Sequence, residues 1–206
     1  MQTENAQSRM EKRKATSEIR YSHIAGWLQH ESSVLDLGAG WGFGYQFLRE
    51  KGIKITSVDL DDERLANMPS DPGVFVINSK IEDFLKQNKE RYDAVILAEL
   101  IEHIPLWRWK VFLSDILRIA DRIIITTPFD QDQFAYMSRH LDQYSDPDKH
   151  EPYIHKVFGI KAEMFRLLGF QVPRSEIIKV PRKNAGLVAS ALGKGHSEFL
   201  LVEITS

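Results

Sequence analysis

The feature that most constrains this chain is a glycine-rich turn that directly follows a short apolar run. The run Ser33–Leu37 ends at Gly38, and Gly40 and Gly42 follow at alternate positions. Glycine lacks a Cβ and tolerates positive φ, so such a turn lets the backbone approach a ligand at the start of the next helix. Glycines also end strands for structural reasons, so the turn alone leaves both interpretations open.

Apolar runs of strand length alternate with helix-length segments along most of the chain. Such alternation predicts a parallel sheet, because parallel strands need crossover connections. Near the end, the segments 170–180 and 199–204 predict an antiparallel strand pair at the sheet edge. We therefore expect an α/β, Rossmann-like sheet of seven mostly parallel strands, with helices on both faces and an antiparallel C-terminal strand. The other expected strands are Ser33–Leu37, Ile53–Val58, Val74–Ile77, Ala94–Ala98 and Ile123–Thr127, and the expected helices are one from about Thr16 and those at 44–51, 61–67, 81–88, 106–119 and 161–168.

The chain length of 206 residues suits one domain with one hydrophobic core. We expect residues 1–15 to form a flexible N-terminal segment and residues 16–206 to form the domain. An insertion at about 130–158, rich in aromatic and histidine side chains, either walls a small-molecule pocket or is an ordinary surface excursion.

Charge and cysteine content exclude several classes of function. With 27 basic and 29 acidic side chains, the chain has no net field that would attract nucleic acid. The absence of cysteine excludes disulfides, thiolate zinc sites and cysteine nucleophiles. No apolar segment reaches membrane-spanning length. We expect a cytoplasmic protein that does not bind membranes, for which nucleic acid is a disfavoured partner and the oligomeric state stays open.

Spacing within the glycine turn separates two nucleotide cofactors. The dinucleotide fingerprint needs a glycine three places after the second one, where this chain has Phe43. The next expected strand ends at Asp59, nineteen residues after Gly40, where a ribose-binding acid lies in such folds. A carboxylate there accepts two hydroxyl hydrogen bonds. Asp59 is also placed to cap the helix expected from Asp61, and this alternative stays open.

Together these motifs resemble those of the class I S-adenosylmethionine-dependent methyltransferases, over residues 16–206. The resemblance implies S-adenosylmethionine as cofactor and S-adenosylhomocysteine as product. It also implies that the glycine turn holds the methionine part, that Asp59 holds the ribose, and that the turn after the third strand frames the adenine. An aspartate frequent in the family is replaced there by Ser79-Lys80, and an acid such as Glu82 also suits any helix N-terminus. The cofactor-binding residues so implied are Asp36, Gly38, Ala39, Gly40, Asp59, Leu60, Ile81, Glu82, Ala98 and Glu99.

A cluster of two acids and a histidine follows the fourth expected strand. The segment from Glu99 to His103 is similar to the Glu-x-x-Glu-His motif of ubiquinone-biosynthesis-type methyltransferases and to that of small-RNA 2′-O-methyltransferases. We expect His103 to act as general base and Glu102 to orient it or bind a metal. Alternatively, the two form a local pair that caps the next helix. The RNA-methylating relatives bind a divalent ion through two Glu and two His. The candidate ligands here are Glu99, Glu102, His103 and His155, but we do not favour a metal.

Three functions remain open. The leading one is an enzyme that methylates an oxygen or nitrogen of a small molecule. The second is a metal-dependent RNA ribose 2′-O-methyltransferase, and the third is a non-catalytic module that binds S-adenosylmethionine. Arg20 and Tyr21 on the first helix would close over the cofactor carboxylate, or simply dock that helix on the sheet.

Overall fold

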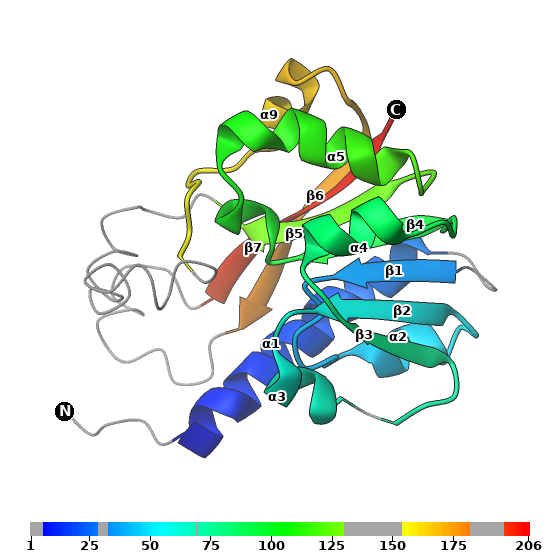
Figure 1. The fold of residues 1–206 in the computed structure, drawn as a ribbon. Coiled ribbons are helices and arrows are strands. Elements are labelled where there is room, and N and C mark those ends of the chain that lie inside the picture. The colour runs from blue at the N-terminus through cyan, green and yellow to red at the C-terminus, as the bar shows by residue number, and fades with distance from the viewer. Residues whose placement is uncertain (1–5, 29–32, 69, 130–153, 182–195) are drawn as a thin grey trace. The chain divides into compact units, whose positions relative to one another are not determined.

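Strands and helices alternate along the chain as predicted, in a computed structural model that describes residues 6–28, 33–68, 70–129, 154–181 and 196–206 (Figure 1). Contacts divide the chain into two units, Met1–Ala94 and Val95–Ser206. The prediction of one domain over residues 16–206 stays a prediction.

The first unit contains three parallel strands, which lie side by side in the order β3-β2-β1 (Figure 1). They are β1 (Ser33–Leu37), β2 (Lys54–Asp59) and β3 (Val74–Asn78). Leu37 pairs with Val58, so β1 and β2 end at the same edge. The aliphatic side chains of β1 and β2 are buried, as the continuous apolar runs require. This edge therefore receives both the glycine turn and Asp59.

Four helices belong to the first unit: α1 (Ala6–Trp27), α2 (Tyr45–Arg49), α3 (Asp62–Ala66) and α4 (Ile81–Gln87). The first begins at Ala6, earlier than the expected start near Thr16. The added turns consist mainly of Ala, Gln, Met, Glu, Lys and Arg, which are strong helix formers even without an apolar periodicity. Helix α1 packs against α2, which begins directly after the glycine turn.

The second unit contains four strands in the order β4-β5-β7-β6. They are β4 (Ala94–Ala98, from the unit boundary), β5 (Ile123–Pro128), β6 (Gln171–Pro181) and β7 (His196–Thr205). β4 and β5 are parallel, and β7 runs antiparallel to both of its neighbours. The described residues thus contain seven strands with the predicted directions, including the antiparallel C-terminal strand and an edge pair.

The helix expected at 106–119 consists of a short 3₁₀ turn followed directly by an α-helix. Two 3₁₀ turns, η1 (Ile101–His103) and η2 (Leu106–Arg108), precede α5 (Trp109–Leu117). One face of α5 is buried at helical spacing by Trp109, Phe112, Leu113 and Ile116. The Trp109 ring stacks on Phe165 of α9 (Ala162–Leu167). The Trp109 Nε1–H also donates to the Ile104 carbonyl at 2.8 Å, which ties α5 to the segment that carries Glu102 and His103.

The described residues cover two further expectations only in part. Residues 130–153, most of the insertion expected at 130–158, lie outside the described residues, and so do the aromatic and histidine side chains expected to wall a pocket there. Among the described helices, none is both long and apolar enough to cross a membrane.

Candidate functional site

The glycine turn adopts the backbone that its sequence predicts. Gly38 has φ 74° and Gly40 has φ 58°, both in the left-handed region that favours glycine. The amides of Gly38 and Ala39 donate to the Val58 carbonyl at 2.8 and 3.2 Å, which fastens the turn to the end of β2. Ala39 itself is buried. The turn therefore has one fixed conformation at the edge where β1 and β2 end.

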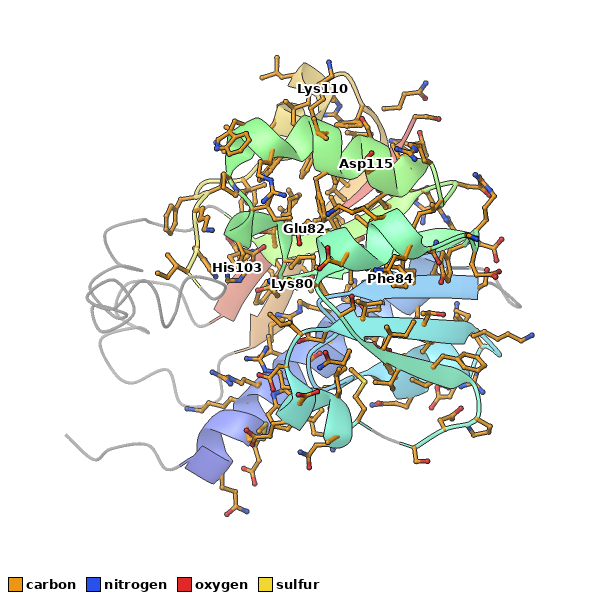
Figure 2. All side chains as sticks on the ribbon, in the orientation of Figure 1. Lys80, Glu82, Phe84, His103, Lys110 and Asp115 are labelled. Atoms are coloured by element: carbon orange, nitrogen blue, oxygen red, sulfur yellow. The ribbon has the colours of Figure 1, made fainter. Side chains whose placement is uncertain are left out.

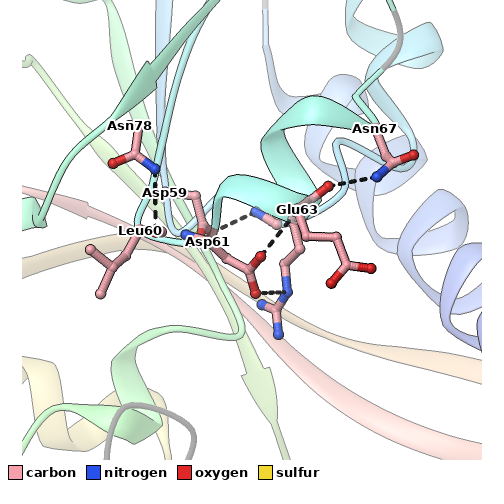
Figure 3. Close-up of polar contacts among 8 residues, drawn as sticks. Asp59, Leu60, Asp61, Glu63, Asn67 and Asn78 are labelled. Atoms are coloured by element: carbon pink, nitrogen blue, oxygen red, sulfur yellow. Dashed lines mark hydrogen bonds and ion pairs between the residues drawn. The ribbon is translucent and has the colours of Figure 1, made fainter.

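Asp59 is joined to the glycine turn by a direct hydrogen bond. Its Oδ2 accepts from the Gly40 amide at 2.8 Å, and its Oδ1 accepts from the Asp61 amide at 2.9 Å. The cap of α3 is Asp61, which accepts from the Arg64 amide at 3.1 Å (Figure 3), so the alternative in which Asp59 caps this helix is wrong. Each carboxylate oxygen has a second lone pair, so Asp59 can still accept hydroxyl groups.

The residues predicted near the adenine lie at the ends of β2 and β3. Leu60, next to Asp59, is 51% exposed, and its carbonyl accepts from the Asn78 amide group at 3.3 Å (Figure 3). Ile81 and Glu82 form the first turn of α4, and the Glu82 side chain is exposed (Figure 2). Both positions suit an adenine contact and an ordinary helix start alike, so the adenine assignment stays a prediction.

Asp36 lies at the centre of a fully buried polar cluster beneath the glycine turn. Its Oδ2 accepts from the Tyr21 hydroxyl of α1 at 2.5 Å and from the Tyr45 hydroxyl of α2 at 2.8 Å. The Tyr45 oxygen lies 2.7 Å from the Ser57 hydroxyl, and Ser57 is the donor because Tyr45 gives its one proton to Asp36. Among the residues that the structure describes, Asp36 Oδ1 has no hydrogen-bond partner.

Burial raises the pKa of each titratable group in this cluster. Desolvation raises the pKa of Asp36 from 3.8 to about 7, against the lowering effect of the Tyr21 and Tyr45 hydrogen bonds. Burial likewise raises the pKa of both tyrosines well above their ordinary value. Asp36 and Tyr21 were predicted from the sequence to lie near the cofactor, whereas Tyr45 and Ser57 were not predicted to belong to this cluster. A hydroxyl-bearing residue directly after the glycine turn was the available signal for Tyr45.

At the end of β4, the backbone takes an unusual conformation. Ala98 is the last strand residue, and Glu99 has φ 57°, in the left-handed region that non-glycine residues seldom adopt. The Glu99 amide donates to the Thr126 carbonyl at 2.8 Å, which holds this conformation in place. Such strain clusters at functional sites, which fits the predicted role of Glu99 without testing it.

Glu102 and His103 are both held by specific contacts in the second unit. Glu102 is 1% exposed, and its Oε2 accepts from the Thr127 hydroxyl at 3.1 Å. His103 Nδ1 lies 3.2 Å from the Ile154 carbonyl, which can only accept, so Nδ1 carries the proton and the neutral ring has its lone pair on Nε2. The N-cap residues of η2 and α5 are Pro105 and Arg108, and neither forms a side-chain cap hydrogen bond. The alternative in which Glu102 and His103 pair to cap the next helix stays open.

His155 joins this pair across a long stretch of sequence. The amides of Lys156 and Val157 donate to the Glu102 backbone carbonyl at 2.7 and 3.1 Å. The His155 and His103 rings pack edge to face, with 4.7 Å between their centroids. One ligand atom from each of Glu102, His103 and His155 lies within 4.8 Å of the others. A carboxylate oxygen and two imidazole nitrogens are a donor set that divalent transition metals accept.

Comparison with known families decides where the chain belongs. The family model described as methionine biosynthesis protein MetW matches residues 19–138, which is more than half of the chain. The chain belongs to the MetW family. The MetW match includes the glycine turn, Asp59 and the pair of Glu102 and His103, and it ends before His155.

Two curated relatives have the same printed name, ubiquinone biosynthesis O-methyltransferase. The protein from Serratia proteamaculans is 31% identical over 80 residues, 36% of this chain and 33% of that protein. The protein from Vibrio atlanticus is 34% identical over 77 residues, 35% of this chain and 32% of that protein. The chain thus spans about a third of the length of the curated relatives it matches.

Solved structures resemble this MetW-family chain over nearly its whole length. A cyclopropane-fatty-acyl-phospholipid synthase-like protein from Lactobacillus casei has a TM-score of 0.68 at 14% identity, covering 98% of this chain and 94% of that one. Magnesium protoporphyrin IX methyltransferase from Synechocystis, solved with bound SAH, has a TM-score of 0.61 at 14% identity, covering 100% and 90%. The predicted Rossmann-like fold is confirmed.

Proposed function

We propose that this MetW-family protein is an S-adenosylmethionine-dependent methyltransferase that acts on an oxygen or nitrogen of a small molecule. The observation that carries the proposal is the hydrogen bond from the Gly40 amide to Asp59 Oδ2. It fixes a glycine turn and a ribose-type acid against each other at the ends of adjacent parallel strands, where open α/β sheets bind nucleotides.

In this proposal, the first unit binds most of the cofactor. The Asp59 carboxylate accepts the ribose hydroxyls, Leu60, Ile81 and Glu82 border the adenine, and the glycine turn with Asp36 takes the methionine part. Ala98 and Glu99 are proposed as further contacts from the end of β4. When bound, S-adenosylmethionine supplies a methyl group already activated on a sulfonium, so the protein needs to supply no covalent catalyst. The relatives named as O-methyltransferases support this cofactor.

We propose that the second unit deprotonates the acceptor. The Ile154 carbonyl holds the His103 ring in the tautomer with a lone pair on Nε2, which is the state a general base requires. Glu102 is buried and held by Thr127, and one of its carboxylate oxygens lies within 4.8 Å of a His103 ring nitrogen. An ionised carboxylate at this position would favour the imidazolium that forms. An acceptor hydroxyl or amine then loses its proton to His103 as the methyl group arrives.

A methyl-transfer assay with a labelled methyl group tests the proposal. We would offer the protein panels of phenols, aliphatic alcohols, amines and RNA, beside a His103→Gln variant. Label on a small molecule, lost in the variant while cofactor binding persists, supports the proposed base. Cofactor binding without turnover on any panel would instead favour a non-catalytic binding module.

A second candidate function is metal-dependent methylation of an RNA ribose. The cluster of Glu102, His103 and His155 is the observation that favours it. Turnover on RNA that EDTA abolishes and Mn²⁺ restores would support this candidate, because a bound cation polarises a ribose hydroxyl.

A further inference from the structure

The N-terminal helix is tied to the glycine turn more closely than a merely docked helix requires. From α1, the Ser17 hydroxyl donates to the Phe43 carbonyl at 2.8 Å, and Tyr21 donates to Asp36. Gly44 has φ 95°, and a Cβ at this position would lie 2.6 Å from Tyr21 Cβ. The glycine therefore admits the Tyr21 side chain to the buried carboxylate.

Asp36 is only half satisfied in this arrangement. Both tyrosine hydroxyls bind Oδ2, while Oδ1 is buried and has no partner within the described parts of the chain. A buried acceptor without a donor destabilises the fold, because it has lost its hydrogen bonds to water. Two aligned hydroxyls on one oxygen also fix the rotation of the carboxylate, so Oδ1 has a defined direction.

We propose that Tyr21 is a positioning residue of the cofactor site, which holds Asp36 through Oδ2 so that Oδ1 accepts a hydrogen bond from the bound cofactor. This inference rests on the proposed function. Tyr21 acts through Asp36 and need not touch the cofactor itself. Because Tyr21 belongs to α1, the inference also makes the N-terminal helix part of the binding machinery.

The charged and titratable groups around Asp36 give this role a pH signature. Tyr21 of α1 and Tyr45 of α2 lower the pKa of Asp36 by hydrogen bonding, and Asp59 of β2 raises it. Burial raises the pKa of Tyr21, and the charge of Arg20 on α1 lowers it. Removing the Tyr21 hydroxyl therefore raises the pKa of Asp36 above about 7, so a smaller fraction of the protein carries the ionised acceptor at neutral pH.

Calorimetric titration of the full chain with S-adenosylhomocysteine from pH 6 to pH 9 tests the inference, because this ligand undergoes no turnover. For Tyr21→Phe we expect about fivefold weaker binding at pH 7, because a rise of one unit in the pKa of Asp36 lowers its ionised fraction about fivefold. The pH midpoint of binding should rise by up to about one unit, because Asp36 loses one of the two hydrogen bonds that lower its pKa. Tyr45→Phe should move the midpoint in the same direction.

Ser17→Ala is the matched control, because it removes a hydroxyl bond from the same helix to the same turn without touching Asp36. Its pH profile should match that of the wild type. A Tyr21→Phe profile that matches the wild type would overturn this inference alone. A wild type that binds the ligand at no pH would overturn the proposed function as well.

Discussion

Replacement of Asp36 by Asn should change how the stability of the protein depends on pH. The buried carboxyl has a folded-state pKa of about 7 against an ordinary 3.8, so the folded state prefers its protonated form. At 1.36 kcal/mol per unit, ionising it in the fold costs about 4 kcal/mol at high pH. The sign follows directly: the cost is absent below pH 3.8, grows as pH rises toward 7, and is constant above that.

Between pH 5 and pH 8, the wild type should therefore lose about 2–3 kcal/mol of free energy of unfolding relative to Asp36→Asn. Asn has nearly the same shape and keeps an oxygen that can accept from Tyr21, but it does not ionise. Urea unfolding followed by tryptophan fluorescence at several pH values measures the difference. Asp83→Asn, at an exposed acid of α4, controls for the change in net charge. Parallel pH curves for wild type and Asp36→Asn would refute the reasoning.

Three further predictions concern the second unit. Thr127→Val should lower the free energy of unfolding by about 1–3 kcal/mol, because it leaves the buried Glu102 oxygen without this donor, whereas Thr127→Ser should lose less; urea unfolding compares them. Glu99→Gly should leave stability within about 1 kcal/mol of the wild type, because glycine adopts φ 57° without strain, yet weaken cofactor binding in calorimetry if Glu99 contacts the cofactor. EDTA should leave turnover on a small-molecule acceptor unchanged in the labelled-methyl assay, and a loss that Mn²⁺ reverses would contradict this.

Most of the correct predictions from the sequence rested on local patterns of residues. The run Ser33–Leu37 and its glycines fixed β1 and the turn, because backbone conformations with positive φ leave few residues to choose from. The interval between Gly40 and Asp59 predicted an acid at the adjacent strand end, and the two are in direct contact. These features depend on neighbours in sequence or on the fixed geometry of a parallel strand pair.

Contacts between segments that lie far apart in the chain could not be predicted from the sequence. Nothing near His103 indicates that the Ile154 carbonyl sets its tautomer, and nothing near Asp36 indicates that Tyr45 binds the same oxygen as Tyr21. The early start of α1 at Ala6 does not follow from apolar periodicity, which residues 6–15 lack although they favour helix. Such features depend on how separate elements pack together.

The most direct test of the account is calorimetric titration of the protein with S-adenosylmethionine and S-adenosylhomocysteine, with NAD as a control ligand. An Asp59→Ala variant removes the predicted ribose acceptor, and Asp62→Ala, at an exposed acid in the same turn, serves as the matched control. We predict micromolar binding of both ligands, weakened by about 2–4 kcal/mol in Asp59→Ala and unchanged in Asp62→Ala. No binding of either ligand, or binding of NAD in their place, would contradict the account.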